Sequence, residues 1–243
     1  MGGGFWGDVW RRARAAGFAV INSLIHSLFD RPQRLYHRSD PNQEFDLTPI
    51  ILILPIGNWV LETACKTLRS WQRTELTCNL TLSINVSASQ FLQSNFVSHI
   101  EALVRDYGIC ADRLKLELTE SLLLMDVEDT IKKIGALNTI GIRLELDDFG
   151  TGYSSLQYLK RLPLDQIKID QSFLRDIETD ADDRAIVTTI INMSKSLNVG
   201  VIAEGVETNV QRQFLIDHGC KHFQGYMFGK PVPEEQFIET LKD

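Results

Sequence analysis

The sequence switches repeatedly between two hydrophobic periods, and this alternation limits the fold more than any other feature. From Pro55 onward, segments with apolar residues three or four positions apart, as in amphipathic helices, take turns with short segments of alternating apolar and polar residues, as in strands. Strands that are separated by helices pair in parallel through right-handed crossovers. The pattern therefore predicts an α/β fold, either a (β/α) barrel or an open doubly wound sheet.

The individual elements follow from the same pattern. We expect strands at residues 80–86, 113–119, 142–147, 166–170, 200–203 and 222–224. We expect helices at residues 57–73, from a cap at Ser87 to Tyr107, and at 127–138, 156–161, 182–197, 208–218 and 234–242. Residues 1–52 do not show this alternation of helical and strand patterns. We therefore expect a non-matching, partly disordered N-terminal segment over 1–52 and an α/β domain over 53–243, with the boundary near Pro49 to Pro55.

Composition excludes several classes of protein. The net charge of −7 argues against a partner that is a nucleic-acid polymer, because an acidic surface repels phosphates. Four cysteines lack the Cys-x-x-Cys spacing, so we interpret them as reduced core thiols. The apolar run from Pro49 to Leu61 is too short and too interrupted to span a membrane. A basic patch precedes Phe18 to Phe29, as in signal peptides and interfacial helices, yet we expect a cytoplasmic chain without a membrane span.

Polar residues lie at the carboxyl end of almost every predicted strand. The strands run in parallel, so their carboxyl ends meet at one edge, where α/β proteins place their sites. The residues concerned are Asn85, Glu117, Asp147, Asp148, Lys168, Asp170, Glu204, Glu207 and Gln224. Crowded carboxylates repel one another unless a cation neutralises them, and oxygen ligands select Mg²⁺ or Mn²⁺. A pair of such ions suits the hydrolysis of a phosphodiester, with Lys168 orienting the nucleophile or stabilising the developing charge.

Each of these residues also has an ordinary structural interpretation. Asp147 and Asp148 are compatible with a helix cap or a solvated loop, and Asn85 with a strand end that satisfies backbone groups. Glu117 is compatible with an ion pair to Lys115 or Arg143, Lys168 with one to Asp170, and Glu204 to Glu207 with a surface turn. Glu145 points the same way as Asp147 by strand alternation. The loop Phe149–Ser155 (FGTGYSS) has two glycines, Gly150 and Gly152, that tolerate positive φ.

Six segments together resemble the EAL-domain family of bacterial cyclic-di-GMP phosphodiesterases. They are Leu80–Gln90 (LTLSINVSASQ), Leu116–Ser121 (LELTES), Leu146–Leu156 (LDDFGTGYSSL), Ile167–Asp170 (IKID), Val201–Thr208 (VIAEGVET) and Phe223–Pro231 (FQGYMFGKP). The resemblance covers Ile53 to Asp243. It implies a TIM-like (β/α)₈ barrel, incomplete here with about six recognisable strands, and cleavage of cyclic di-GMP to pGpG with two Mg²⁺ or Mn²⁺ ions.

The resemblance also implies roles for individual residues. The implied metal ligands are Asn85, Glu117, Asp147, Asp148 and Glu204, and the implied catalytic residues are Lys168, Glu204 and Asp170. Gln224 and Pro231 match positions that line the substrate pocket. Glu120 resembles the acid that anchors the loop with Gly150 and Gly152, which in relatives links the site to dimerisation, and we group Glu207 with these loop residues. A homodimer is therefore a further expectation.

One departure from the family concerns its name. The Glu-Ala-Leu triplet normally stands near the end of an early strand, where its Glu binds metal and a following Arg grips the substrate. Residues 1 to about 52 have a sequence unrelated to that part of the family. Glu44 is separated from Pro55 by far fewer residues than the family spacing requires. We expect either a replacement segment or a truncated or shifted reading frame. Three hypotheses follow: a phosphodiesterase, impaired or not; a module that binds cyclic di-GMP or a protein without turnover; and a Mg²⁺-dependent barrel lyase.

Overall fold

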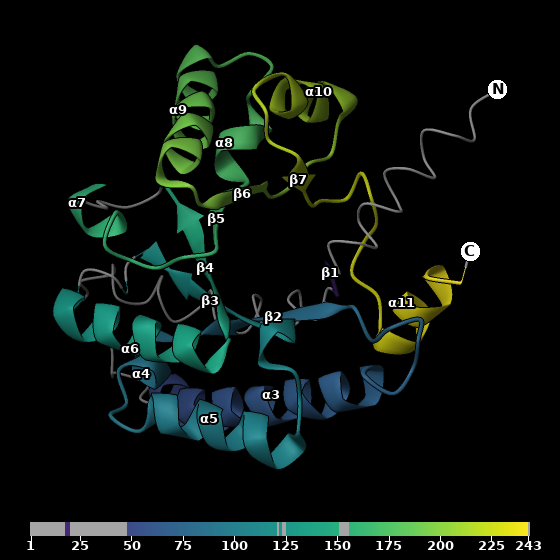
Figure 1. Cartoon of the computed structure of the whole chain (residues 1–243). Coiled ribbons are helices and arrows are strands. Elements are labelled where there is room, and N and C mark those ends of the chain that lie inside the picture. Colours follow the sequence, from purple (N-terminus) through teal and green to yellow (C-terminus); the bar gives the residue numbers. More distant parts are fainter. Residues whose placement is uncertain (1–17, 20–47, 121, 123–124, 151–155, 243) are drawn as a thin grey trace. The chain divides into compact units, whose positions relative to one another are not determined.

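The computed structural model describes residues 18–19, 48–120, 122, 125–150 and 156–242. Its strands are β1 Phe18–Ala19, β2 Thr81–Val86, β3 Leu114–Thr119, β4 Arg143–Phe149, β5 Gln166–Ile169, β6 Gly200–Ala203 and β7 His222–Phe223. They follow chain order in one sheet (Figure 1). β1 pairs with β2 in parallel, and β4, β5, β6 and β7 pair in parallel successively. All six predicted strands are confirmed, and β1 adds a seventh.

The helices are α3 Thr48–Trp71, α4 Ala88–Phe91, α5 Phe96–Tyr107, α6 Val127–Ile140, α7 Leu156–Leu159, α8 Ser172–Arg175, α9 Ala181–Leu197, α10 Asn209–Asp217 and α11 Glu234–Thr240, with the 3-10 helix η1 Ala111–Arg113. The chain folds into two compact units. The first unit comprises residues 1–116, 140–142 and 231–243, and the second comprises 117–139 and 143–230. The predicted boundary near residue 52 stays a prediction.

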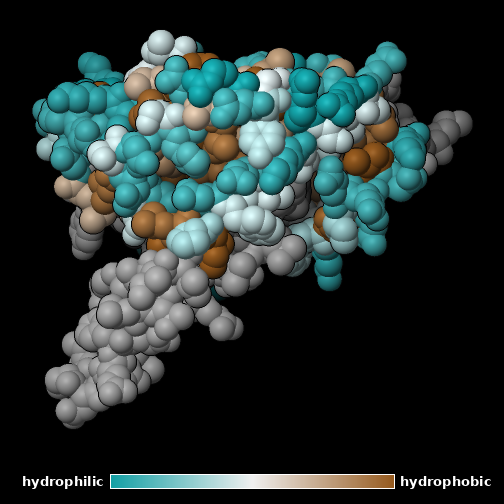
Figure 2. Space-filling view, turned by 90° about the horizontal axis from the view of Figure 1, so that it is seen from below, coloured by the Kyte–Doolittle hydropathy of each residue, from teal (hydrophilic) through white to brown (hydrophobic). Residues whose placement is uncertain are grey.

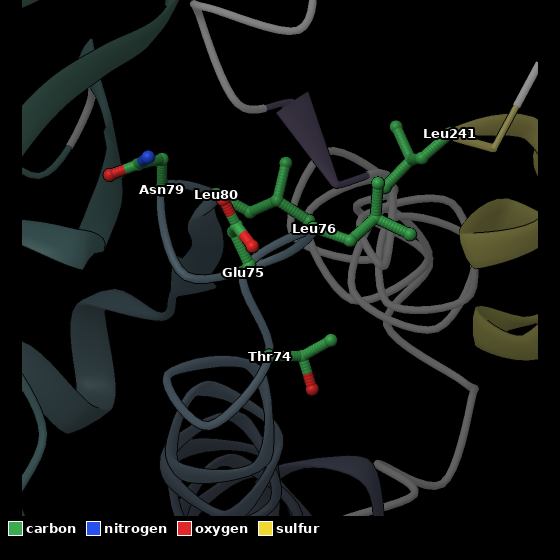
Figure 3. A pocket seen from close by; sticks show the side chains of 6 residues that line it. All are labelled: Thr74, Glu75, Leu76, Asn79, Leu80 and Leu241. Carbon is green, nitrogen blue, oxygen red and sulfur yellow. The ribbon is translucent and has the colours of Figure 1, made fainter.

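In the first unit, α3 packs against β2, α4 and α5. Its last residue, Trp71, also attaches the C-terminal helix α11, because the indole Nε1 donates to Oε1 of Glu234 at 2.8 Å and the ring lies against Phe237. A cavity of about 670 Å³ opens beside the loop between α3 and β2 (Figure 3). The residues that line it are Thr74, Glu75, Leu76, Asn79, Leu80 and Leu241, none of which is a predicted site residue.

Two predicted helices differ from the observed ones. Helix α3 begins at Thr48 rather than at Gly57 and continues through Pro55, although proline lacks the N–H that would bond the preceding turn. The predicted helix from Ser87 to Tyr107 is broken into α4 and α5. Phe91 and Phe96 explain the break: both are buried with ring centroids 5.4 Å apart, whereas residues five apart in a continuous helix point about 140° away from each other.

The predicted helix ends agree well with the structure. The Ser87 side chain accepts a bond from the backbone N–H of Gln90 in a capping box, and Gly108 ends α5 in the left-handed conformation with φ of 59°. In the second unit, α9 packs against β5 and β6 (Figure 1). Thr208 caps α10 in a second capping box. Polar caps and glycine stops therefore place helix ends where local hydrogen bonding requires them.

All four cysteines are free, but only Cys65 and Cys220 are buried, while Cys110 is exposed. The interpretation of all four as core thiols was therefore wrong.

The described part of the surface carries exposed apolar residues in scattered positions. In the face shown in Figure 2, hydrophobic residues occur in small groups among hydrophilic ones. The most exposed apolar side chains, Trp59 and Met125, lie on separate segments, which is ordinary for a protein surface. Among the helices described, none is long and apolar enough to cross a membrane.

Candidate active site

Four charged side chains meet toward the carboxyl ends of strands β3 to β6, all within the second unit. The ammonium Nζ of Lys168, on β5, lies 2.7 Å from Oε2 of Glu117 and 2.9 Å from Oδ1 of Asp147. It also lies 2.6 Å from Oε1 of Glu204, which directly follows β6. Only 13% of the Glu204 side chain is exposed, and the other three are almost fully buried. We call these four residues the Lys168 cluster.

Strand alternation explains why these particular residues meet. Ile167 and Ile169 flank Lys168 on β5 and are both fully buried, so the lysine points to the opposite face of the sheet. The parallel register sets Lys168 beside Ile202 on β6, two residues before Glu204. The same alternation on β3 places Glu117 between the buried Leu116 and Leu118. The sequence prediction that these strand ends converge is therefore confirmed for four residues.

Burial and mutual repulsion govern the protonation of the cluster. Desolvation raises the pKa of Glu204 to about 7, the Lys168 ammonium opposes this rise, and the charges of Asp147 and Glu117 add to it. Desolvation likewise raises the pKa of Glu117, against the effect of Lys168 and with that of Asp147 and Glu145. Burial alone would lower the pKa of Lys168, but the three carboxylates outweigh burial and hold it well above its ordinary value. Lys168 is therefore charged at neutral pH.

A turn after β6 positions Glu204. Gln224 donates from Nε2 to Oε1 of Glu204 at 2.6 Å, the same oxygen that contacts Lys168. The backbone continues the pairing of β6 and β7 beyond the strands, because the N–H of Gln224 donates to the carbonyl of Ala203 and the N–H of Val206 donates to that of Gln224. This bond between Gln224 and Glu204 was not anticipated, although the two residues follow neighbouring predicted strands.

Gly225 makes the close approach of these two segments feasible. Its φ is 155°, and a Cβ at this position would lie 2.2 Å from the backbone nitrogen of Val206 and 2.3 Å from its carbonyl oxygen. We expect Gly225→Ala to lower the free energy of unfolding by about 3 kcal/mol or more, since a rigid backbone cannot yield to the methyl group.

Gly135→Ala is the matched control, measured by urea denaturation beside the first variant. Apart from its chain neighbours and the backbone of its own helix, no described atom lies within 4 Å of a Cβ at Gly135, which is inside α6. Alanine should therefore raise the free energy of unfolding there by about 1 kcal/mol. Equal stability of the Gly225→Ala variant and the unchanged protein would contradict this account of the turn.

A second acid, Glu120, bonds the backbone directly after β4. The backbone N–H of Gly150, with φ of 100°, donates to Oε2 of the buried Glu120 at 3.0 Å. Two residues earlier, Asp148 has a φ of 54°, and its backbone N–H donates to Oδ1 of Asp147 at 3.1 Å. Glu120 thus contacts the loop that the sequence assigned to it, while Gly152 lies outside the described residues.

The remaining predicted site residues lie elsewhere. Asp170 accepts a bond from the N–H of Ser172 through Oδ1 where the chain leaves β5. Lys168 pairs with the three cluster carboxylates. The alternative interpretation of Lys168 as the ion-pair partner of Asp170 was therefore wrong. Glu207 is exposed, and its N–H is bonded by the Gln211 side chain of the α10 cap. Asn85, near the end of β2, and the exposed Pro231 belong to the first unit. Glu44 lies outside the described residues.

The letters Glu-Ala-Leu do occur once in the chain, at residues 101–103. They lie within helix α5, with Glu101 exposed and Leu103 buried. An exposed helical glutamate does not occupy a strand end. Among the described residues, no Glu-Ala-Leu triplet follows a strand.

The donor set of the cluster fits a hard divalent cation in its chemistry. Three carboxylates surround one ammonium, which leaves an excess of buried negative charge, and carboxylate oxygens are the ligands that Mg²⁺ and Mn²⁺ prefer. Within the described ranges, no three acidic, histidine or cysteine side chains already form a cage for a metal ion. Lys168 Nζ holds the position between the three carboxylates.

Comparisons with known proteins place the chain in a family. Residues 47–231 match the EAL domain. The chain is 41% identical over 190 residues to the signaling protein YkoW of Bacillus subtilis, covering 78% of this chain and 24% of that protein. It is 38% identical over 190 residues to the bifunctional diguanylate cyclase/cyclic di-GMP phosphodiesterase MucR of Pseudomonas aeruginosa, covering 78% of this chain and 28% of that protein. The chain thus belongs to the EAL domain family, and it spans about a quarter of the length of these relatives.

Solved structures agree with this membership. The c-di-GMP complex of the PaMucR phosphodiesterase superposes with a TM-score of 0.75 at 38% identity, over 79% of this chain and 77% of that one. A manganese/cy-diGMP complex of BlrP1 from Klebsiella pneumoniae gives a TM-score of 0.65 at 28% identity, over 78% and 46% of the two chains. The prediction of an α/β fold of EAL type is confirmed.

Proposed function

We propose that the chain is a metal-dependent phosphodiesterase that hydrolyses cyclic di-GMP to linear pGpG. The Lys168 cluster carries this proposal, because it gathers three buried carboxylates and one lysine from four parallel strands in a chain of the EAL family. MucR and NbdA of Pseudomonas aeruginosa are both named as cyclic di-GMP phosphodiesterases, and the complexes of PaMucR and BlrP1 contain that nucleotide.

Each proposed role rests on a property of the residue that performs it. The proposed metal ligands are Asn85, Glu117, Asp147, Asp148 and Glu204. Two Mg²⁺ or Mn²⁺ ions, when bound, supply positive charge for the phosphate and activate a water molecule. Lys168, charged at neutral pH, donates hydrogen bonds to the attacking oxygen or the phosphate. Glu204, whose carboxylate lies 2.6 Å from Lys168 Nζ, is also the candidate general base.

The other residues of the site take supporting roles in this proposal. Gln224 orients Glu204 through its 2.6 Å bond and borders the substrate. Asp170 assists Lys168 in catalysis, and Pro231 lines the pocket. Glu120, Gly150, Gly152 and Glu207 hold the loops around the site. Pairing of two copies through the loop after Phe149 is also proposed, and light scattering of the purified protein tests it.

A direct assay tests the phosphodiesterase activity. We expect the purified chain to convert cyclic di-GMP to pGpG in the presence of Mn²⁺, as measured by liquid chromatography, and chelation of the metal to stop the reaction. Asp147→Asn keeps the shape of the side chain and removes its charge, and it should reduce turnover at least about a thousandfold. Absence of pGpG even at high enzyme concentration would refute the activity.

A second candidate function is binding of the nucleotide without turnover. The observation that favours it is the location of Glu101: the chain's one Glu-Ala-Leu triplet is helical, and its glutamate is exposed. Calorimetry with cyclic di-GMP separates the two candidates, because a non-catalytic module binds the nucleotide and leaves it intact.

A further inference from the structure

Asp148 has an unusual backbone for a residue inside a strand. Among the described residues, Asp148 and Asn198 are the non-glycine residues with positive φ, at 54° and 56°. Asn198 ends helix α9, where the left-handed conformation is common. Asp148 instead lies within β4, between Asp147 and Phe149, where extended backbone is the rule. Strained residues of this kind persist where the surrounding structure determines them.

The register of β4 against β5 shows what this conformation achieves. Leu146 is opposite Ile167 and Phe149 is opposite Ile169, with a bulge between the two pairs. In that step β5 provides one residue, Lys168, whereas β4 provides two, Asp147 and Asp148. Residues three apart in a regular strand point to opposite faces. The extra residue lets both Leu146 and Phe149 remain buried, and it sets two consecutive acids opposite Lys168.

Contacts on both sides of Asp148 hold the bulge. The N–H of Asp148 donates to Oδ1 of Asp147, the oxygen that lies 2.9 Å from Lys168 Nζ. On the other side, Gly150 is bonded to Glu120, and a Cβ on Gly150 would lie 3.0 Å from the Phe173 ring. The left-handed residue therefore lies between the bonded Gly150 and the carboxylate that contacts the lysine.

We infer that Asp148 is a positioning residue: its left-handed backbone closes the bulge that holds Asp147 against Lys168. The role is separate from any metal ligation by its carboxylate, and it requires a residue that tolerates positive φ. Its consequence for metal binding rests on the proposed function, whereas its consequence for the geometry of Asp147 does not.

A glycine–alanine pair separates the backbone from the carboxylate. Asp148→Gly and Asp148→Ala both lack the acid, but only glycine adopts positive φ without cost. We expect the alanine variant to have a folding equilibrium constant about tenfold lower than the glycine variant, measured by urea denaturation. Crystal structures should show the bulge and the contact between Asp147 and Lys168 retained with glycine and displaced with alanine. Asp148→Asn should retain both, because asparagine tolerates the left-handed region.

Lys132→Gly and Lys132→Ala form the control pair, on the exposed side of helix α6. There the order should reverse, with glycine less stable than alanine. If the two Asp148 variants were equally stable, or if alanine left the bulge and the contact of Asp147 unchanged, the inference would be overturned. Mn²⁺ affinity, measured by calorimetry, should also be about tenfold weaker with alanine than with glycine. Absence of Mn²⁺ binding and turnover in the unchanged protein would refute the proposed function alone, since stability and crystal structure still decide the role of Asp148.

Discussion

Replacing Lys168 with methionine should lower the free energy of unfolding of the metal-free protein by about 3–5 kcal/mol at pH 8. The ammonium contacts three buried carboxylates at 2.6 to 2.9 Å, and methionine fills a similar volume without the charge. Removing it leaves the carboxylates to repel one another in a space that excludes water. If the proposed phosphodiesterase activity holds, turnover should also fall at least about a thousandfold, because the proposed donor to the phosphate is then missing.

The effect of Lys168→Met should depend on pH in a defined direction. The pKa values of Glu117 and Glu204 are already raised by burial, and loss of the lysine raises them further. Glu204, with a pKa of about 7, is largely protonated at pH 5.5 and then repels its neighbours little, and the raised pKa of Glu117 acts in the same direction. The destabilisation should therefore be smaller at pH 5.5 and grow as the pH rises through 7.

Urea denaturation at the two pH values measures this difference. Lys132→Met, at an exposed helix position, is the control and should change stability by less than about 0.5 kcal/mol at either pH. A Lys168→Met protein that is as stable at pH 8 as the unchanged protein would show that the lysine does not compensate the carboxylates.

The sequence predicted the site because its chemistry repeats along the chain. Glu117, Asp147 and Lys168 occupy strands with clear alternation, Glu204 directly follows the apolar strand β6, and parallel strands place such residues at one edge. The three contacts of Lys168 and the bond of Gln224 with Glu204 depend on register and on the turn after β6. Register is set by the packing of whole strands, so no local pattern reveals it.

Local strain was the other feature that the sequence did not reveal. No sequence pattern predicts the bulge at Asp148, since an Asp-Asp pair is equally compatible with a cap or a loop. The break between α4 and α5 arises from the contact of Phe91 with Phe96, which forms only in the folded chain. Helix α3 passes through Pro55 because tertiary packing outweighs the intrinsic preference against proline. In each case packing in the folded chain decides the local structure, even against a strong preference such as that of proline.

Glu204→Gln should weaken the binding of Mn²⁺ about 10- to 100-fold at pH 8 and remove much of its pH dependence near neutrality. The pKa of Glu204 is raised from an ordinary value of 4.5 to about 7, so in the unchanged protein a metal ion must displace a proton below pH 7. Apparent affinity should therefore rise about tenfold per pH unit up to pH 7 and level off above it, whereas glutamine has no proton to displace.

The same shift fixes the sign of the effect on stability. A carboxyl whose pKa is raised by folding contributes stability that is fully present below pH 4.5 and is lost as the pH rises through 7. Mn²⁺ should restore this loss in the unchanged protein and do so less in the glutamine variant, as thermal denaturation with and without the metal would show.

Glu101→Gln provides the matched control, because it makes the same chemical change at the exposed glutamate of the helical Glu-Ala-Leu triplet. Calorimetry between pH 6 and 8 should give this variant the Mn²⁺ affinity of the unchanged protein at every pH. A Glu204→Gln protein with the unchanged pH profile would exclude Glu204 as the group that titrates near 7. An equally large loss in Glu101→Gln would instead assign the metal to the helical triplet, because an exposed charge that does not bind the ion is screened by solvent and changes its affinity little.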